Sequence, residues 1–171
     1  MRKSTLAALT VVGLAATLAS YPTGALAGTS GPDRAPDQVL DLTGEPYATD
    51  LIAAKAATAP YRDVAEAEAD GYVLSSPMCV PSKGVHYLRS VAESPEELRI
   101  TEPNALVYAP TSTGGLKLLG VEYVSRVPAT LFGRDFEQSG AVHYYTLHVW
   151  LWEKEPVELI AADNPHITCG T

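Results

Sequence analysis

The most constraining feature of this sequence is the segment VHYYTLHVWLW at residues 142–152, in which side chains of different character alternate with a period of two. That period is typical of a β-strand, whose successive side chains point to opposite faces of a sheet. One set is almost wholly apolar and should meet the main core: Tyr145, Leu147, Val149 and Leu151. The other set is large, aromatic and polar-tipped: Tyr144, Thr146, His148, Trp150 and Trp152. The second face does not resemble a solvated Lys/Glu face, and it indicates a polar site.

Three further segments show the same period and are predicted to be strands: residues 84–90, 104–110 and 116–127. The sequence TSTGG at residues 111–115 is typical of a hairpin turn between the second and third of them. In residues 116–127, alternation places Leu119 on one face and Leu118 on the other, together with Glu122. We therefore expect a run of antiparallel strands.

A helix is predicted before the strands. Apolar residues recur every three or four positions between residues 51 and 68, and Gly71 stands where a helix C-cap is expected. Pro60 interrupts the pattern, so we expect either two short helices or one kinked helix. The order predicts an α+β domain in which the helix packs on a curved antiparallel sheet, as in a cystatin-like roll. A β-sandwich with a peripheral helix is the alternative.

The N-terminal residues have the pattern of an export signal. Arg2 and Lys3 precede an apolar run that ends in the A-x-A motif Ala25–Ala27, which predicts a signal peptide over residues 1–27. The run is shorter than the roughly 20 apolar residues of a spanning helix, so no stable membrane insertion is expected. Residues 28–45 are rich in Gly, Pro and Asp and predict a flexible leader, and residues 46–171 predict one globular domain. The expected location is extracellular.

The charge balance argues against one class of partner. The chain has 12 Lys and Arg against 20 Asp and Glu; without Arg2 and Lys3 ten basic residues remain, a formal charge of −10. Nucleic acids are bound through clusters of Lys and Arg, so an acidic chain of this kind is not expected to bind them. The sequence does not indicate an oligomeric state.

Cys79 and Cys169 are the two cysteines of the chain. In an exported protein they predict one structural disulfide, which would close a loop of about 90 residues. Two thiolate metal ligands are the alternative, but the C-x-x-C spacing of such sites is missing. The disulfide is the favoured prediction.

Glu122 lies in the middle of a predicted strand among apolar neighbours, where an unpaired carboxylate is costly to bury. If the strands are neighbours, His86, Glu122 and His148 converge on the second face, with Trp150 and Tyr144 as walls of a pocket. Two imidazoles and a carboxylate are suitable ligands for zinc, copper or iron. A structural network, in which Glu122 is hydrogen-bonded to a histidine or paired with an arginine, is the alternative.

Three functions remain open on the sequence alone. The first is a secreted binding domain whose pocket holds a divalent metal or a small molecule. The second is a metal-dependent hydrolase or lyase at the same site, in which Glu122 is the candidate base. The third is a structural or protein-interaction domain with a satisfied polar core.

The remaining histidines are predicted to lie away from this site. His143 should lie at the rim, at the start of the last strand, and His166 should face solvent. Asp163 and Asn164 indicate an Asx-type turn before His166.

Over residues 55–170, the segments G-V-H-Y, G-V-E-Y and H-V-W-L-W, followed by N-P-H-I-T-C, resemble a family of exported bacterial proteins common in actinomycetes. The resemblance implies that His86, Glu122 and His148 are signature positions and that Cys79 and Cys169 are the paired cysteines. It implies no reaction. Pro60 departs from the family pattern and bears only on the continuity of the helix.

Overall fold

The computed structural model describes residues 42, 44–75, 78–140, 143–153 and 158–169, which all belong to one compact unit, Pro36–Thr171. The predicted signal peptide and almost all of the predicted leader lie outside the described residues, so those two boundaries stay predictions. No helix among the described residues is long and apolar enough to cross a membrane.

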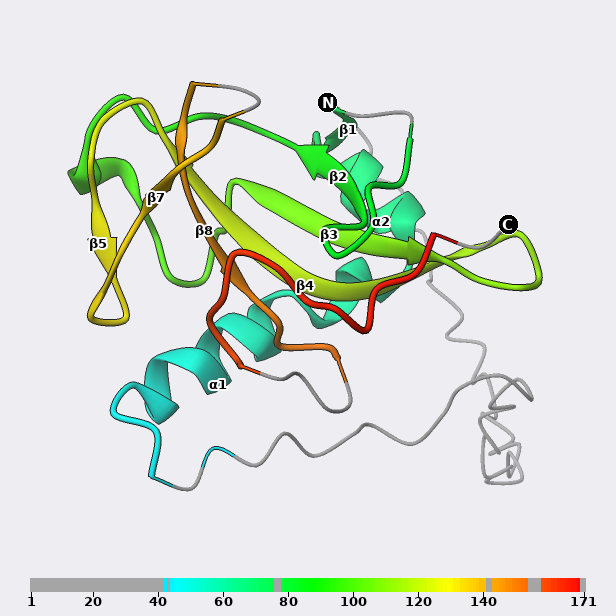
Figure 1. The fold of residues 1–171 in the computed structure, drawn as a ribbon, viewed down its shortest axis with the longest axis horizontal. Helices are drawn as coiled ribbons and strands as arrows, with labels where there is room; N and C mark the ends of the chain where they lie inside the picture. The colour runs from blue at the N-terminus through cyan, green and yellow to red at the C-terminus, as the bar shows by residue number, and fades with distance from the viewer. Residues whose placement is uncertain (1–41, 43, 76–77, 141–142, 154–157, 170–171) are drawn as a thin grey trace, which may run out of the picture. The chain divides into compact units, whose positions relative to one another are not determined.

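Six strands form an open antiparallel sheet in the spatial order β1-β2-β3-β4-β8-β7 (Figure 1). Their bounds are β1 Val73–Leu74, β2 Val85–Leu88, β3 Ala105–Pro110, β4 Leu116–Ser125, β7 Glu137–Gln138 and β8 Tyr145–Val149. A separate ribbon pairs β5 Thr130–Leu131 with β6 Arg134–Asp135. All four predicted strands are present, each shorter than its predicted range, and the predicted turn at residues 111–115 joins β3 to β4.

The helical region is broken at Pro60, as predicted. It consists of α1 Ala48–Ala57, the 3-10 helix η1 Ala59–Arg62, and α2 Val64–Ala69; a further 3-10 turn, η2, spans Pro95–Glu97. Asp63 caps α2, because its side chain accepts a hydrogen bond from the backbone N–H of Ala65. Gly71 ends α2 at φ 87°, and the backbone N–H groups of Gly71 and Tyr72 donate to Glu68 and Ala67 in a Schellman motif.

The helices cover one face of the sheet. Leu51 and Ala54 of α1 and Ala67 of α2 belong to the same buried cluster as the core-facing side chains of the strands. Those strand residues are Val85, Tyr87, Leu106, Tyr108, Leu118, Val121, Tyr123, Leu147 and Val149. The α+β prediction of a helix packed on an antiparallel sheet is therefore confirmed. The described strands form one main sheet and not two packed sheets, so the sandwich alternative is not observed.

A bulge in β4 corrects one prediction from simple alternation. The β3–β4 register shifts between Val107 and Tyr108, which face Gly120 and Leu118 respectively. The extra residue exchanges the two leucines: Leu118 joins the main core, and Leu119 joins a second cluster on the other face. Alternation resumes after the bulge, so Glu122 remains on the predicted face.

Trp152 is a second correction, because β8 ends at Val149 and alternation does not extend to it. The Trp152 indole N–H donates to the hydroxyl oxygen of Thr58, at the end of α1, over 3.1 Å. Lys55 and Arg62 lie over the Trp152 ring. Trp152 thus packs with the helices and not with His148.

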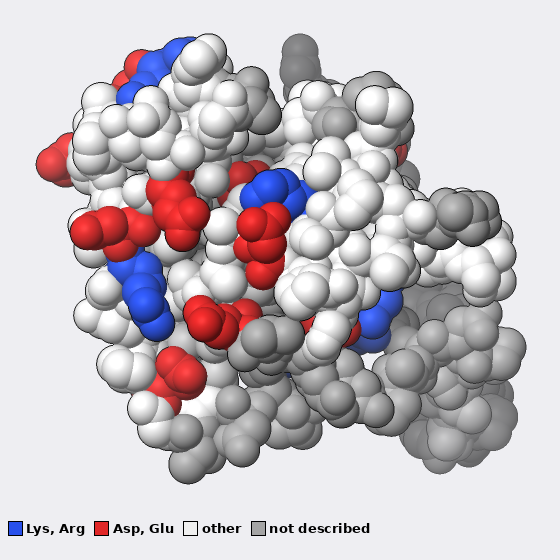
Figure 2. Space-filling view, viewed as in Figure 1, with Lys and Arg blue, Asp and Glu red and all other residues white. Residues whose placement is uncertain are grey.

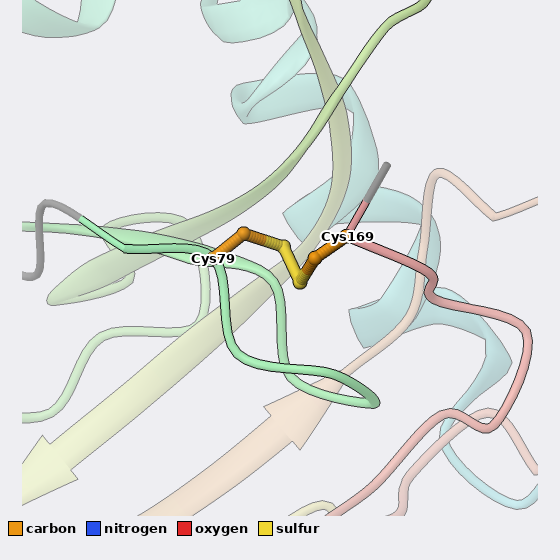
Figure 3. The surroundings of a disulfide bond; sticks show 2 residues. All are labelled: Cys79 and Cys169. Atoms are coloured by element: carbon orange, nitrogen blue, oxygen red, sulfur yellow. A yellow bond between two sulfur atoms is a disulfide. The ribbon is translucent and has the colours of Figure 1, made fainter. Parts of the chain in front are cut away.

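Residues 158–169 cover part of the second face of the sheet. Ile167 packs with Val107, Leu119 and Trp150, and Figure 1 shows this red segment crossing β4. The predicted disulfide is present: it joins Cys79, in the loop before β2, to Cys169 (Figure 3). Backbone hydrogen bonds from Asn164 to Ser82 and from Ser82 to Ile167 tie the same two segments together.

We expect the double variant Cys79→Ala/Cys169→Ala to be less stable than the wild type. Opening a loop of 90 residues raises the conformational entropy of the unfolded chain, which lowers the free energy of unfolding by up to about 4–5 kcal/mol. Urea denaturation of both proteins measures the change. The wild type treated with reductant should match the variant, and an unchanged denaturation midpoint would contradict the prediction.

Candidate metal centre

Three strands bring the predicted histidines and glutamate together. His86 comes from β2, Glu122 from β4 and His148 from β8, and Glu122 pairs directly with His148 in the β4–β8 register. The assumption that all three strands are direct neighbours is wrong for β2, because β3 lies between β2 and β4. The residue of β3 opposite Glu122 is Ala105, whereas His86 is in register with Val107, so His86 and Glu122 approach each other diagonally across β3.

The nitrogen and oxygen atoms of the three side chains converge on one point. The Nε2 atoms of His86 and His148 are 3.3 Å apart. Glu122 places Oε1 at 3.4 Å from the Nε2 of His148 and Oε2 at 3.7 Å from the Nε2 of His86. One ligand atom from each residue lies within 4.8 Å of the others, so the group could hold a metal ion.

Burial sets the protonation of the group. It lowers the pKa of His86 to about 4, with Lys83 as a second cause, and it lowers the pKa of His148 to about 3, aided by His86 and Lys83. Burial raises the pKa of Glu122 to about 7, although Lys83 and a hydrogen bond from Thr146 oppose the rise. At neutral pH both imidazoles are therefore neutral, and their contacts with Glu122 are not ion pairs.

The contacts within the group differ in strength. The Nε2 atoms of His86 and His148 are within hydrogen-bonding distance at 3.3 Å, and Glu122 accepts a hydrogen bond from Thr146. The approaches of Glu122 to the two histidines, at 3.4 and 3.7 Å, are longer than the range of about 2.7–3.2 Å of ordinary hydrogen bonds between nitrogen and oxygen. The carboxylate is therefore only loosely bonded to the two imidazoles.

The ring of Trp150 packs against the ring of His148. The two rings are stacked, with centroids 5.4 Å apart and planes 17° from parallel, and Trp150 is completely buried. Its indole N–H donates to the carbonyl oxygen of Ala161. Gly120 makes room for this ring, because a Cβ there would lie 3.0 Å from it and 2.6 Å from the carbonyl oxygen of Val149. Trp150 thus orients His148 and does not form the pocket wall that the sequence predicted.

A cavity of about 530 Å³ opens onto the three side chains. Its walls include Tyr144, as expected, together with Leu88, Ala105 and Val124 from the sheet. Lys83 and Asp163 line it from the two segments that the disulfide joins. The centre is therefore buried in the sheet face but accessible to a small molecule.

Two residues at this site were missed from the sequence, Lys83 and Thr146. Lys83 lies in a loop, where no periodicity indicates direction. Thr146 shares the face of His148, but nothing in the sequence indicated that it would donate to Glu122.

The other predicted positions lie where they were expected, with one difference. His166 is exposed, and its backbone N–H donates to the side chain of Asn164 in the predicted Asx turn. His143 is exposed beside the strand, at φ 55°, so it precedes β8 and does not begin it.

Comparisons with known proteins gave no matching family model, no similar curated protein and no similar solved structure. The resemblance to exported actinomycete proteins therefore stays a prediction. The function of this domain has to be inferred from the geometry of the chain's own residues.

For the metal-free protein, kept so by a chelator, we expect the free energy of unfolding to fall as the pH is lowered from 6.5 towards 4. Over that window the unfolded chain protonates both histidines, while the folded protein keeps them neutral. Glu122 acts in the opposite sense, because its contribution is lost as the pH rises from 4.5 to about 7, but two imidazoles outweigh one carboxyl group.

The variant His148→Gln tests this pH dependence. Removing one buried imidazole should reduce the slope of stability against pH by up to about 1.4 kcal/mol per pH unit. Urea denaturation at several pH values gives the slope, and His166→Gln, at an exposed histidine, is the control. Equal slopes for His148→Gln and the wild type would contradict the prediction.

Proposed function

We propose that this domain binds a divalent metal ion, with zinc as the favoured ion, through His86, Glu122 and His148. The observation that carries the proposal is the convergence of two neutral imidazole nitrogens and a carboxylate at the wall of a cavity. Zinc is bound by neutral imidazole and carboxylate oxygen, and sites with three protein ligands leave a fourth position open. The binding energy of the ion would offset the cost of burying Glu122 as an anion.

The donor set favours zinc, because two imidazoles and a carboxylate with an open fourth position are typical of zinc sites. Copper binds imidazole ligands more tightly, and non-haem iron is also bound by two histidines and a carboxylate, so both are competitors.

The surroundings support the approach of a cation. On the face shown in Figure 2, acidic side chains cover more of the surface than basic ones, and the chain has a formal charge of −8. An acidic surface raises the local concentration of cations. We also propose that the protein is secreted: the disulfide is typical of an oxidising compartment, and the N-terminal pattern is that of a signal peptide.

A metal-dependent hydrolase or lyase is the second candidate, and the cavity beside the three side chains favours it. With Glu122 as a ligand, the metal would activate a water molecule in the open position. If Glu122 is not a ligand, its pKa of about 7 suits a general base.

For the second candidate we expect zinc-loaded protein to hydrolyse p-nitrophenyl acetate faster than chelated protein, measured by nitrophenolate release. For Glu122→Gln we expect the same rate with zinc and with chelator. For His166→Gln we expect zinc to raise the rate as it does in the wild type. Equal rates with and without zinc would leave binding as the only supported function.

For the main proposal we expect about one zinc ion per chain, measured by elemental analysis after dialysis against zinc and then buffer. His86→Ala/His148→Ala should lose the ion because two of the three ligands are gone. Free zinc at about 100 times its Kd should raise the free energy of unfolding of the wild type by about 2.7 kcal/mol and leave the double variant unchanged.

The matched control is His143→Ala/His166→Ala, which removes the same number of histidines from exposed positions. It should bind zinc like the wild type, while the first double variant should remain folded by circular dichroism. If neither the wild type nor the control binds zinc, copper or iron, the three side chains are a structural polar cluster and the proposal fails.

A further inference from the structure

We propose that the cavity binds a small organic monocarboxylate with an apolar body, and that its carboxylate lies between the metal ion and the ammonium group of Lys83. The inference rests on the proposed metal site and names the class of ligand that occupies its open position.

The charge of the centre favours an anion. Two neutral imidazoles and one carboxylate leave a divalent ion with a net charge of +1 in a buried place, where charges are poorly screened. The three side chains line a cavity, so a carboxylate that entered it could reach the ion and would neutralise that charge.

Lys83 is the second element of the proposed anion site, since it is the one Lys or Arg among the described residues that line this cavity. Its Nζ donates to the carbonyl oxygen of Ala162 over 3.0 Å and pairs with Asp163 over 3.1 Å. An ammonium group has three donors, so these contacts leave one for a ligand. Lys83 lines the same cavity as His86, Glu122 and His148, so its ammonium group and the three side chains border one space.

The loop that carries Lys83 is held in place. Ser82 exchanges backbone hydrogen bonds with Asn164 and Ile167, and Gly84 at φ 82° packs where a Cβ would lie 2.4 Å from the carbonyl oxygen of Tyr108. The disulfide anchors the same loop at Cys79. A cation positioned in this way needs little reorganisation when an anion binds.

The remaining walls favour a ligand with an apolar body. Val80, Leu88, Ala105, Val124 and Tyr144 surround the space beyond the three polar side chains. The volume of about 530 Å³ falls within the range of about 300–1,000 Å³ typical of small-molecule sites.

The acidic residues at the cavity limit the charge of the ligand. Asp163 and Glu137 also line it, and both are exposed. The Lys83–Asp163 pair is therefore weak enough for Lys83 to contact a ligand as well. Two carboxylates close by would repel a dianion such as phosphate, so a single negative charge fits best.

The test uses the protein loaded with Co²⁺, whose visible absorption reports changes in the coordination of the ion. Benzoate is the probe, benzamide is its uncharged analogue, and phosphate is the dianion. Benzoate should change the spectrum in a saturable way, with at least tenfold higher affinity than benzamide or phosphate. Lys83→Met should lower the affinity for benzoate about tenfold or more, because a charge-assisted hydrogen bond is lost. Glu137→Gln, the matched control, should bind benzoate as well as or better than the wild type.

The outcomes separate the two proposals. If Co²⁺ does not bind to the wild type, the metal site itself fails. If Co²⁺ binds but benzoate leaves the spectrum unchanged, or binds no better than benzamide, only the ligand inference is overturned. Equal benzoate affinities of Lys83→Met and the wild type would also overturn it.

Discussion

The cost of burying Glu122 is the constraint on which this side of the structure depends. A carboxylate in the middle of a sheet is stable only if it becomes neutral or meets a positive charge. Its neighbours His86 and His148 are themselves too buried to supply that charge at neutral pH. Burial raises the pKa of Glu122 to about 7, so part of the cost is met by protonation. Lys83, which lines the same cavity, and the proposed metal ion are the two sources of positive charge that would stabilise the anion.

Two packed clusters hold His86, Glu122 and His148 in position. The main core, between the helices and the sheet, fixes β2, β3, β4 and β8 in one antiparallel order. The second cluster holds Trp150 against His148, and the bulge in β4 turns Leu119 into that cluster. The positions of the three side chains are thus set by packing on both faces of the sheet, which would reduce the reorganisation needed to bind the proposed metal ion.

The sequence predicted that these three residues would share one face, because each lies in a strand segment whose side chains alternate regularly between the two faces of the sheet. Glu122 and His148 belong to directly paired strands, and His86 lies in the strand beyond β3. The predictions failed where alternation ends. Leu119 lies on the face opposite to the predicted one because a bulge adds one residue to β4. Trp152 packs with the helices because β8 ends at Val149. Lys83 was not found because its position comes from contacts with residues far away in the chain, which no local pattern encodes.

The disulfide also bears on when the metal could be acquired. Lys83 and Asp163 lie on segments joined through Cys79 and Cys169, and 90 residues of chain separate the two cysteines. Because Ala162 and Asp163 line the cavity, it can be completed only after this late segment of the chain has been synthesised. If the protein is secreted and folds outside the cytoplasm, as proposed, the ions present where it folds would decide which metal enters the site.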